Sequence, residues 1–134
     1  MRSLSQRLAL IFGIVFLLLG VLGMFVENGM TTNAHPDTAG RLFGLFPVNL
    51  AHNLVHLAFG IWGIMASRSL SASRTYGRVG AVIYGLLVVL AFVSPTTFGL
   101  IPIGDNVIWL HAILALGLAY LGFAGKDVVP AAVG

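Results

Sequence analysis

The sequence predicts an all-α fold, a four-helix transmembrane bundle that forms a single integral membrane domain over residues 1–134. Composition is the first reason, because charged residues make up only 8% of the chain and apolar residues 58%, whereas a soluble domain carries about 25% charged residues. The second reason is a set of four apolar runs, each close in length to the roughly 20 residues that a helix needs to cross a bilayer. The predicted spans are residues 8–26, 48–66, 79–93 and 107–124.

The first span, residues 8–26, contains no charged residue. It is longer than the roughly 7–15 apolar residues of a secretory signal, and no A-x-A-like cleavage site follows it, so we interpret it as a membrane helix. Its glycines, Gly13, Gly20 and Gly23, predict a face on which another helix can approach closely. The polar segment 27–41 that follows is the longest aqueous loop.

The second span, residues 48–66, follows the aromatic segment RLFGLFP, which we expect to lie at the membrane interface. A short connector with three arginines, residues 67–78, is expected to lead into the third span at residues 79–93. Ser94-Pro95 ends this span.

A stripe of small residues on the third span, formed by Gly77, Ala81 and Gly85, is expected to pack against another helix. The fourth span, residues 107–124, leads into a tail opened by Lys126 and Asp127.

The arginines and lysines predict the orientation of the spans. One side of the membrane receives six of them and the other side only Arg41; the six are Arg2, Arg7, Arg68, Arg74, Arg78 and Lys126. Because cytoplasmic loops are enriched in these residues, both termini and the connector are expected in the cytoplasm.

An internal repeat relates the two halves of the chain. The segment FGLFP at residues 43–47 recurs as FGLIP at residues 98–102, and a histidine stands nine residues after each proline, at His56 and His111. Residues 11–13 likewise resemble residues 83–85. Since each unit contains two spans, the units share one orientation, and we expect a pseudo-two-fold axis along the membrane normal with both histidines at one depth.

The chain also resembles a known family. The segment FGLFPVNLAHNLVHLAFGIWG, the Arg-bearing connector and the segment LIPIGDNVIWLH are similar to an uncharacterised family of small four-span bacterial membrane proteins, domain of unknown function 4383. The resemblance covers nearly the whole chain and implies a four-helix bundle in a bacterial plasma membrane. It implies no activity.

A polar stripe on the second span is the candidate site. Its members share one helical face at i, i+3, i+4 and i+7 spacing; they are Asn49, His52, Asn53 and His56, followed by Gly60 and Gly63. A histidine within a span is costly unless it has a partner, so His56 and His111 need either a ligand or a hydrogen bond. Tyr84 and Tyr120 could point inward as partners or outward to lipid.

Two interpretations of the histidines stay open. In the first, each ring donates to a backbone carbonyl or an asparagine, with Asn49 and Asn53 as hydrogen-bonding groups between helices, each contributing about 0.6 kcal/mol in lipid. In the second, His56 and His111 hold a haem b axially, or join His52 in binding zinc or copper. Asp105, Asn49 or Asn53 would then orient the rings. The first interpretation requires no cofactor and is favoured by the sequence alone.

The same residues limit the function classes. The chain has no cysteine, which excludes disulfides and thiolate metal sites, and no basic patch with interleaved aromatics that would indicate nucleic acid. It also lacks a nucleophile–base pair, paired carboxylates and a phosphate loop, so we do not expect catalysis. We therefore predict an accessory or scaffold subunit that contacts the lipid bilayer and other membrane subunits or its own copies, with a haem- or metal-binding bundle for electron transfer or sensing as the alternative.

Overall fold

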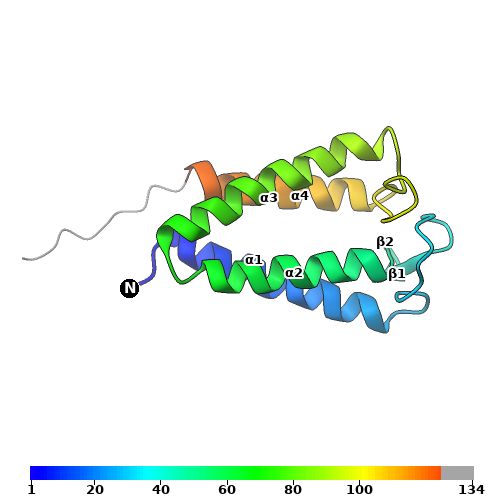
Figure 1. Ribbon diagram of the computed structural model, residues 1–134, viewed down its shortest axis with the longest axis horizontal. Helices are drawn as coiled ribbons and strands as arrows, with labels where there is room; N and C mark the ends of the chain where they lie inside the picture. Colours follow the sequence, from blue (N-terminus) through cyan, green and yellow to red (C-terminus); the bar gives the residue numbers. More distant parts are fainter. Residues whose placement is uncertain (125–134) are drawn as a thin grey trace, which may run out of the picture.

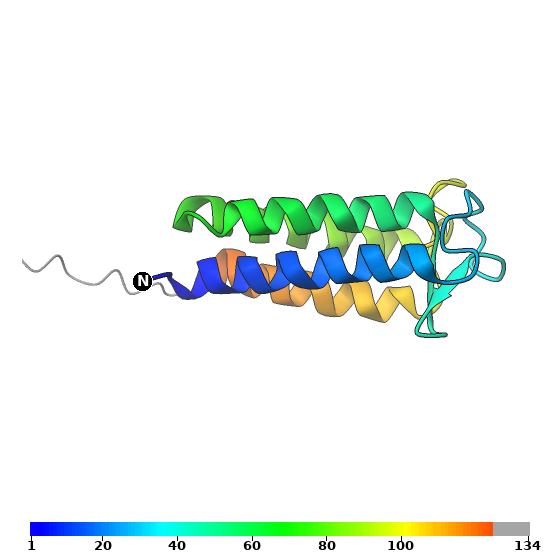
Figure 2. The ribbon, with the colours of Figure 1, turned by 90° about the horizontal axis from the view of Figure 1, so that it is seen from below.

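The computed structural model describes residues 1–124, which form a bundle of four helices with a small β-hairpin at one end (Figure 1). The helices are α1 (Leu4–Phe25), α2 (Leu50–Ala66), α3 (Leu70–Ala91) and α4 (Val107–Ala119), and α4 continues into a short π-helical segment, η1 (Tyr120–Ala124). The hairpin consists of β1 (Gly40–Leu42) and β2 (Phe46–Val48). Two views at right angles show the helices running side by side along the long axis, with the hairpin at the end opposite the N-terminus (Figures 1 and 2).

Length and hydropathy allow three of these helices to cross a membrane. They are α1, α3 and α4 together with η1, whereas α2 is apolar but shorter, at 17 residues. The predicted tail residues Lys126 and Asp127 lie outside the described residues.

Helix α1 pairs with α2, and α3 pairs with α4 and η1. The α1–α2 pair is close because glycines meet: a Cβ placed on Gly13 would come within 2.7 Å of the backbone nitrogen of Ile64. In the second pair, a Cβ on Gly77 would come within 2.6 Å of the backbone nitrogen of Gly122. Small residues at these crossings allow backbone-to-backbone packing, which is how helices gain dispersion energy in lipid.

The connector predicted at residues 67–78 is wrong over most of its length, because α3 begins at Leu70. The side chain of Ser69 caps the helix by accepting from the Ala72 amide, at 3.1 Å. Ser73 donates its hydroxyl to the backbone carbonyls of Ser69 and Ala66. The polar residues of this segment therefore satisfy themselves within a helix, and α3 reaches 22 residues.

The segment RLFGLFP, expected at the membrane interface, lies within the hairpin. Leu42 pairs with Phe46, and both Phe43 (φ 57°) and Gly44 (φ 72°) adopt left-handed backbone conformations in the turn. The buried side chains of the hairpin pack against Val107 at the start of α4. The hairpin thus closes this end of the bundle.

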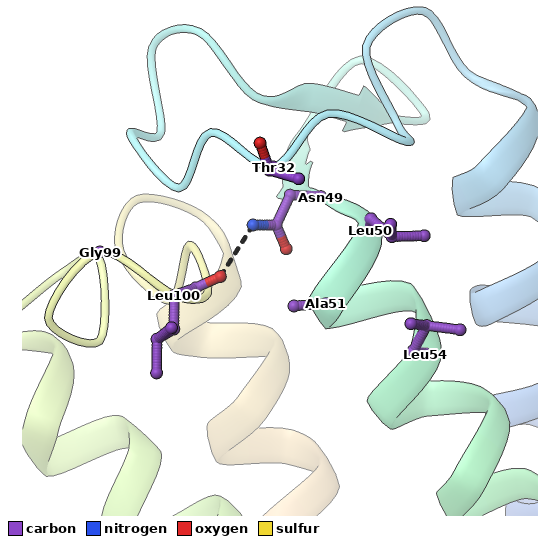
Figure 3. A pocket seen from close by; sticks show the side chains of 7 residues that line it. All are labelled: Thr32, Asn49, Leu50, Ala51, Leu54, Gly99 and Leu100. Atoms are coloured by element: carbon purple, nitrogen blue, oxygen red, sulfur yellow. Dashed lines mark hydrogen bonds between the residues drawn. The ribbon is translucent and has the colours of Figure 1, made fainter.

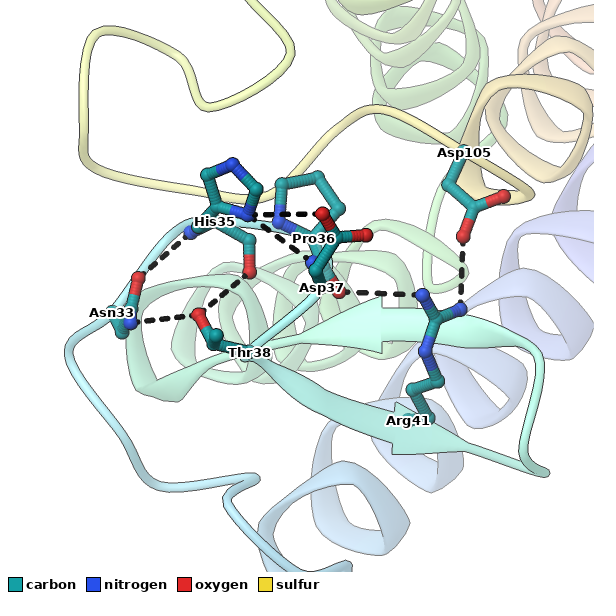
Figure 4. Close-up of polar contacts among 7 residues, drawn as sticks. All are labelled: Asn33, His35, Pro36, Asp37, Thr38, Arg41 and Asp105. Atoms are coloured by element: carbon teal, nitrogen blue, oxygen red, sulfur yellow. Dashed lines mark hydrogen bonds and ion pairs between the residues drawn. The ribbon is translucent and has the colours of Figure 1, made fainter.

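Polar contacts across the loops reinforce this closure (Figure 4). Arg41 forms an ion pair with Asp105 at 2.9 Å, which joins the hairpin to the loop before α4. Asn106 donates to the Leu45 carbonyl at 3.3 Å. On the first loop itself, Asn33 donates to Thr38 at 2.7 Å.

Candidate functional site

Three buried histidines meet in the half of the bundle nearest the hairpin. His52 and His56 lie on successive turns of α2 and His111 lies on α4, and their side chains are 3%, 1% and 1% exposed. One ring nitrogen from each lies within 4.8 Å of the others. We refer to these three residues as the histidine cluster.

His52 is the central member of the histidine cluster. Its ring centroid lies 4.4 Å from that of His56 and 5.5 Å from that of His111. The internal repeat pointed to His56 and His111 as the central pair; the structure brings the ring of His52 beside both. The fold therefore assembles three imidazoles from two helices.

Asn49 holds the two helices of the site in register. Its side-chain oxygen accepts from the His52 amide at 2.9 Å, which caps α2, and its amide nitrogen donates to the Leu100 carbonyl at 2.9 Å (Figure 3). Leu100 belongs to the loop that leads to α4. One side chain thus fixes both the start of α2 and its distance from the second half of the chain.

A cavity of about 250 Å³ opens beside this contact (Figure 3). Leucine and alanine side chains of α2 and the backbone near Gly99 line most of it, and no histidine does. It is a surface hollow between the two halves of the chain and does not form part of the histidine cluster.

Aromatic rings enclose the histidine cluster. Phe16 of α1 lies 5.6 Å from His56, and Tyr84 of α3 lies 5.1 Å from His111, between ring centroids. Phe16 and Tyr84 are themselves 5.3 Å apart. All four helices therefore contribute to the site.

The polar atoms of the site lack hydrogen-bond partners. Among residues 1–124, both ring nitrogens of His52, His56 and His111 have none, and neither has the Tyr84 hydroxyl or the side-chain oxygen of Asn53. The Pro47 carbonyl lies near the His52 ring, but the geometry does not meet that of a hydrogen bond. Leaving one buried polar group unpaired costs about 1–3 kcal/mol, so each of these atoms would gain from a polar partner.

The predicted hydrogen bonds from the histidine rings to the asparagines are not formed within the described part of the chain. The Asn49 amide binds the Leu100 carbonyl, and the Asn53 amide donates to the Gly29 carbonyl at 2.8 Å. Both asparagines tie α2 to loops. Their amide nitrogens are occupied by these carbonyls, and neither asparagine is hydrogen-bonded to a histidine ring.

Asp105, predicted as a second group that orients the rings, lies outside the site. Its carboxylate is 41% exposed and pairs with Arg41 among the loops (Figure 4). It has a left-handed backbone (φ 58°) directly before α4, which turns its side chain toward the hairpin.

The predicted packing residues lie mostly inside the bundle. Gly20 and Gly23 of α1 face Asn53 of α2, and Ala81 packs against the core. Like Gly13, Gly60 and Gly63 lie at the α1–α2 crossing, and Gly77 lies against α4 and η1. Gly85 differs, because a Cβ placed on it meets nothing within 4 Å. The packing expected at Gly85 is not present within residues 1–124.

Sequence reasoning missed Phe16 as a wall of the site and left Tyr84 undecided. Tyr84 is 1% exposed, whereas Tyr120 is 51% exposed. A signal was present for Phe16, because it lies three residues after Gly13 and four before Gly20, on the face that packs against α2.

Comparison with curated proteins and with solved structures found no match. Comparison with family models found one that covers residues 6–124, nearly the whole chain, and its description is Domain of unknown function (DUF4383). The resemblance predicted from the sequence is therefore confirmed. With this coverage, the chain belongs to the family described as Domain of unknown function (DUF4383).

Proposed function

We propose that this protein is an integral membrane bundle that binds a transition-metal ion at the histidine cluster. The observation that carries the proposal is the set of six buried ring nitrogens without hydrogen-bond partners among the described residues, with one from each ring within 4.8 Å of the others. Neutral imidazole is a ligand for zinc, copper, iron and nickel. A bound ion would supply a partner for one nitrogen of each ring.

The distances suit a small ion after modest side-chain rotation. Nitrogen ligands lie about 2.0–2.1 Å from zinc, which places two of them about 3.3 Å apart around a tetrahedral ion. The three donors are within 4.8 Å of one another before any adjustment. The nitrogen that does not coordinate on each ring would remain as a donor, and the Tyr84 hydroxyl is a nearby candidate acceptor.

Charge favours a monovalent ion. The acids among the described residues are Glu27, Asp37 and Asp105, and all three are exposed outside the helices. No carboxylate therefore offsets a cation at the histidine cluster, and the cost of burying an ion rises with the square of its charge. Among metals that imidazole binds, copper has an accessible monovalent state, so we infer Cu(I) as the preferred ion. Oxidation to Cu(II) would add a positive charge that no carboxylate compensates. We therefore infer that the site binds copper and does not use it for electron transfer.

Haem b does not fit this arrangement. An axially bound haem requires a flat macrocycle between two histidines, with free space on all sides of the iron. Here His52, Phe16 and Tyr84 surround the other two histidines with ring-centroid distances of 4.4 to 5.6 Å. Admitting the ring would require separating the helix pairs.

The membrane placement is also part of the proposal. We infer four spans in a bacterial plasma membrane, with α2 crossing beside the three longer helices and both termini in the cytoplasm. In support, the N-terminus and the turn between α2 and α3 lie at one end of the bundle, away from the hairpin (Figure 1). Among the described arginines, only Arg41 then lies at the hairpin end, and the others lie toward the opposite end. Such an excess of basic residues is expected on the cytoplasmic side.

The internal repeat remains a proposal with three supporting observations. The chain packs as two helix pairs, and Phe98 (φ 55°) and Gly99 (φ 90°) repeat the left-handed conformations of Phe43 and Gly44. Phe16 also stands beside His56 as Tyr84 stands beside His111. This last observation pairs Phe16 of α1 with Tyr84 of α3. The sequence match of residues 11–13 with 83–85 aligns the two helices about one turn differently.

The alternative function is that of an accessory or scaffold subunit of a larger membrane complex. Most of the glycine faces that suggested it are used within the chain, but the outer face of α3 around Gly85 is open and apolar. A scaffold would carry no metal and would retain partner subunits after mild solubilisation.

Metal analysis of detergent-purified protein tests the proposal. We expect about one copper ion per chain after incubation with Cu(I) and gel filtration, and a loss of most of it in His56→Leu and His111→Leu. His35→Ala is the matched control, because His35 is exposed on the first loop, and it should retain the metal. The site would be refuted if the wild-type protein bound no copper or if all variants retained equal amounts of it. A Soret absorption band would show that the protein binds haem.

A further inference from the structure

A second candidate site lies on the surface of α3, at the end of the bundle away from the hairpin. Two cavities adjoin there and share one residue, Arg78. The first, of about 430 Å³, has a mixed polar and apolar lining, formed by Leu70, Ser71, Arg74, Thr75 and Arg78, and we call it the polar cavity. The second, of about 270 Å³, is apolar and is lined by Arg78, Val79, Val82, Ile83 and Phe123.

The polar cavity has the chemistry of an anion site. Its polar residues, Ser71, Arg74, Thr75 and Arg78, follow i, i+3, i+4 and i+7 spacing and so share one face of α3. Between Asp37 and Asp105 the chain has no acid. Two guanidinium groups and two hydroxyls therefore lie together on one face of α3.

Arg78 is held in place by contacts to η1. Its Nε donates to the Gly122 carbonyl at 2.9 Å, and its guanidinium lies 5.4 Å from the centroid of the Phe123 ring. Both contacts restrict the side chain at the junction of the two cavities. A planar guanidinium in a fixed orientation is well suited to a phosphate group.

The apolar cavity continues from Arg78 toward the middle of α3. Val82 is 57% exposed and Phe123 is 66% exposed, and their neighbours along the groove are apolar. A charged head beside an apolar groove matches a molecule that is itself anionic at one end and apolar along the rest. A free phosphate ion would use only the first cavity.

We propose that this groove binds an anionic phospholipid, with the headgroup phosphate between Arg74 and Arg78 and one acyl chain against Val79, Val82 and Phe123. The inference rests on the membrane placement proposed above and is independent of the metal. In that placement, the groove begins at the cytoplasmic face, where anionic lipids are attracted by basic residues. The site would anchor α3 and η1 to a specific lipid.

Native mass spectrometry of the purified full chain tests this site. The probes are phosphatidylglycerol and phosphatidylcholine with identical acyl chains, and inorganic phosphate as a competitor. We expect phosphatidylglycerol to be retained over phosphatidylcholine, and Arg78→Gln to lower that preference by about fivefold, the effect of one basic residue at a membrane surface. Inorganic phosphate should not displace the lipid.

Arg68→Gln is the matched control, since Arg68 is exposed at the same end but lines neither cavity. It should keep the wild-type preference. If Arg78→Gln does not fold, Arg74→Gln provides the same comparison without disturbing the contacts to η1. Equal retention of the two lipids, equal losses in the Arg68 and cavity variants, or displacement by phosphate alone would overturn the proposal. Metal content measured on the same samples separates this outcome from failure of the histidine cluster.

Discussion

Two tyrosines of α3 show that a buried polar group need not be hydrogen-bonded. Tyr76 and Tyr84 are both almost fully buried on α3, but the Tyr76 hydroxyl donates to the Phe59 carbonyl at 3.1 Å, whereas the Tyr84 hydroxyl has no partner among the described residues. Two tyrosines of the same helix therefore differ in what their hydroxyls contribute. This difference can be measured.

Tyr84→Phe and Tyr76→Phe should differ in their effects on stability. Removing the unpaired hydroxyl of Tyr84 keeps the ring and removes a desolvated group, so the free energy of unfolding in the metal-free protein should stay the same or rise. Tyr76→Phe should lower it by about 0.5–1.5 kcal/mol, because the buried hydrogen bond to the Phe59 carbonyl is lost. Thermal unfolding in detergent provides the comparison, and a larger loss for Tyr84→Phe would show that its hydroxyl has a partner.

The hydropathy of each segment explains why some helices could be predicted from the sequence and the start of another could not. The apolar runs 8–26, 48–66 and 107–124 largely coincide with α1, α2 and α4 with η1, because unbroken hydrophobicity marks a helix that faces lipid. The start of α3 was missed because Ser69, Ser73 and the arginines make its first two turns polar. Hydropathy cannot distinguish a polar loop from a polar helical turn whose serines bond to the backbone.

The sequence predicted which residues of α2 form the polar site, but it did not predict their contacts. Helical spacing alone places His52 and His56 on one face, and the repeat points to His111. The direction of Asp105 depends on a left-handed residue before α4, and the partners of Asn49 and Asn53 depend on loops that fold back over the helix ends. Such long-range contacts leave no local pattern in the sequence.

Gly13→Ala and Gly85→Ala form a matched pair of tests for the helix crossings. A Cβ on Gly13 would come within 2.7 Å of the Ile64 backbone nitrogen, so α1 and α2 must separate, whereas a Cβ on Gly85 meets open space. Gly85→Ala should be neutral or stabilise the protein by up to about 1 kcal/mol through helix propensity. Gly13→Ala should lower stability by about 1–3 kcal/mol, the range for overpacking. Denaturation of both variants in the same detergent measures the two changes in stability. Equal changes would show that Gly13 does not lie at the α1–α2 crossing.

The whole molecule presents two chemically different ends. The end with the N-terminus and the α2–α3 turn carries Arg2, Arg7 and Arg68, while the other end is closed by the hairpin, with Arg41 paired to Asp105. The histidine cluster lies toward the closed end and the proposed lipid groove at the basic end. Orientation in the membrane therefore determines from which compartment each site is reached.

Single-cysteine labelling tests that orientation, and the chain is well suited to it because it contains no cysteine. Thr32 is exposed on the first loop at the hairpin end, and Ser71 is exposed in the first turn of α3 at the opposite end. With both termini in the cytoplasm, Thr32→Cys should react with a membrane-impermeant thiol reagent in intact cells, and Ser71→Cys should react only after the cells are opened. The reverse pattern would invert the orientation, exposing the basic end to the outside. Labelling of both positions in intact cells would contradict the placement of α2 as a membrane span.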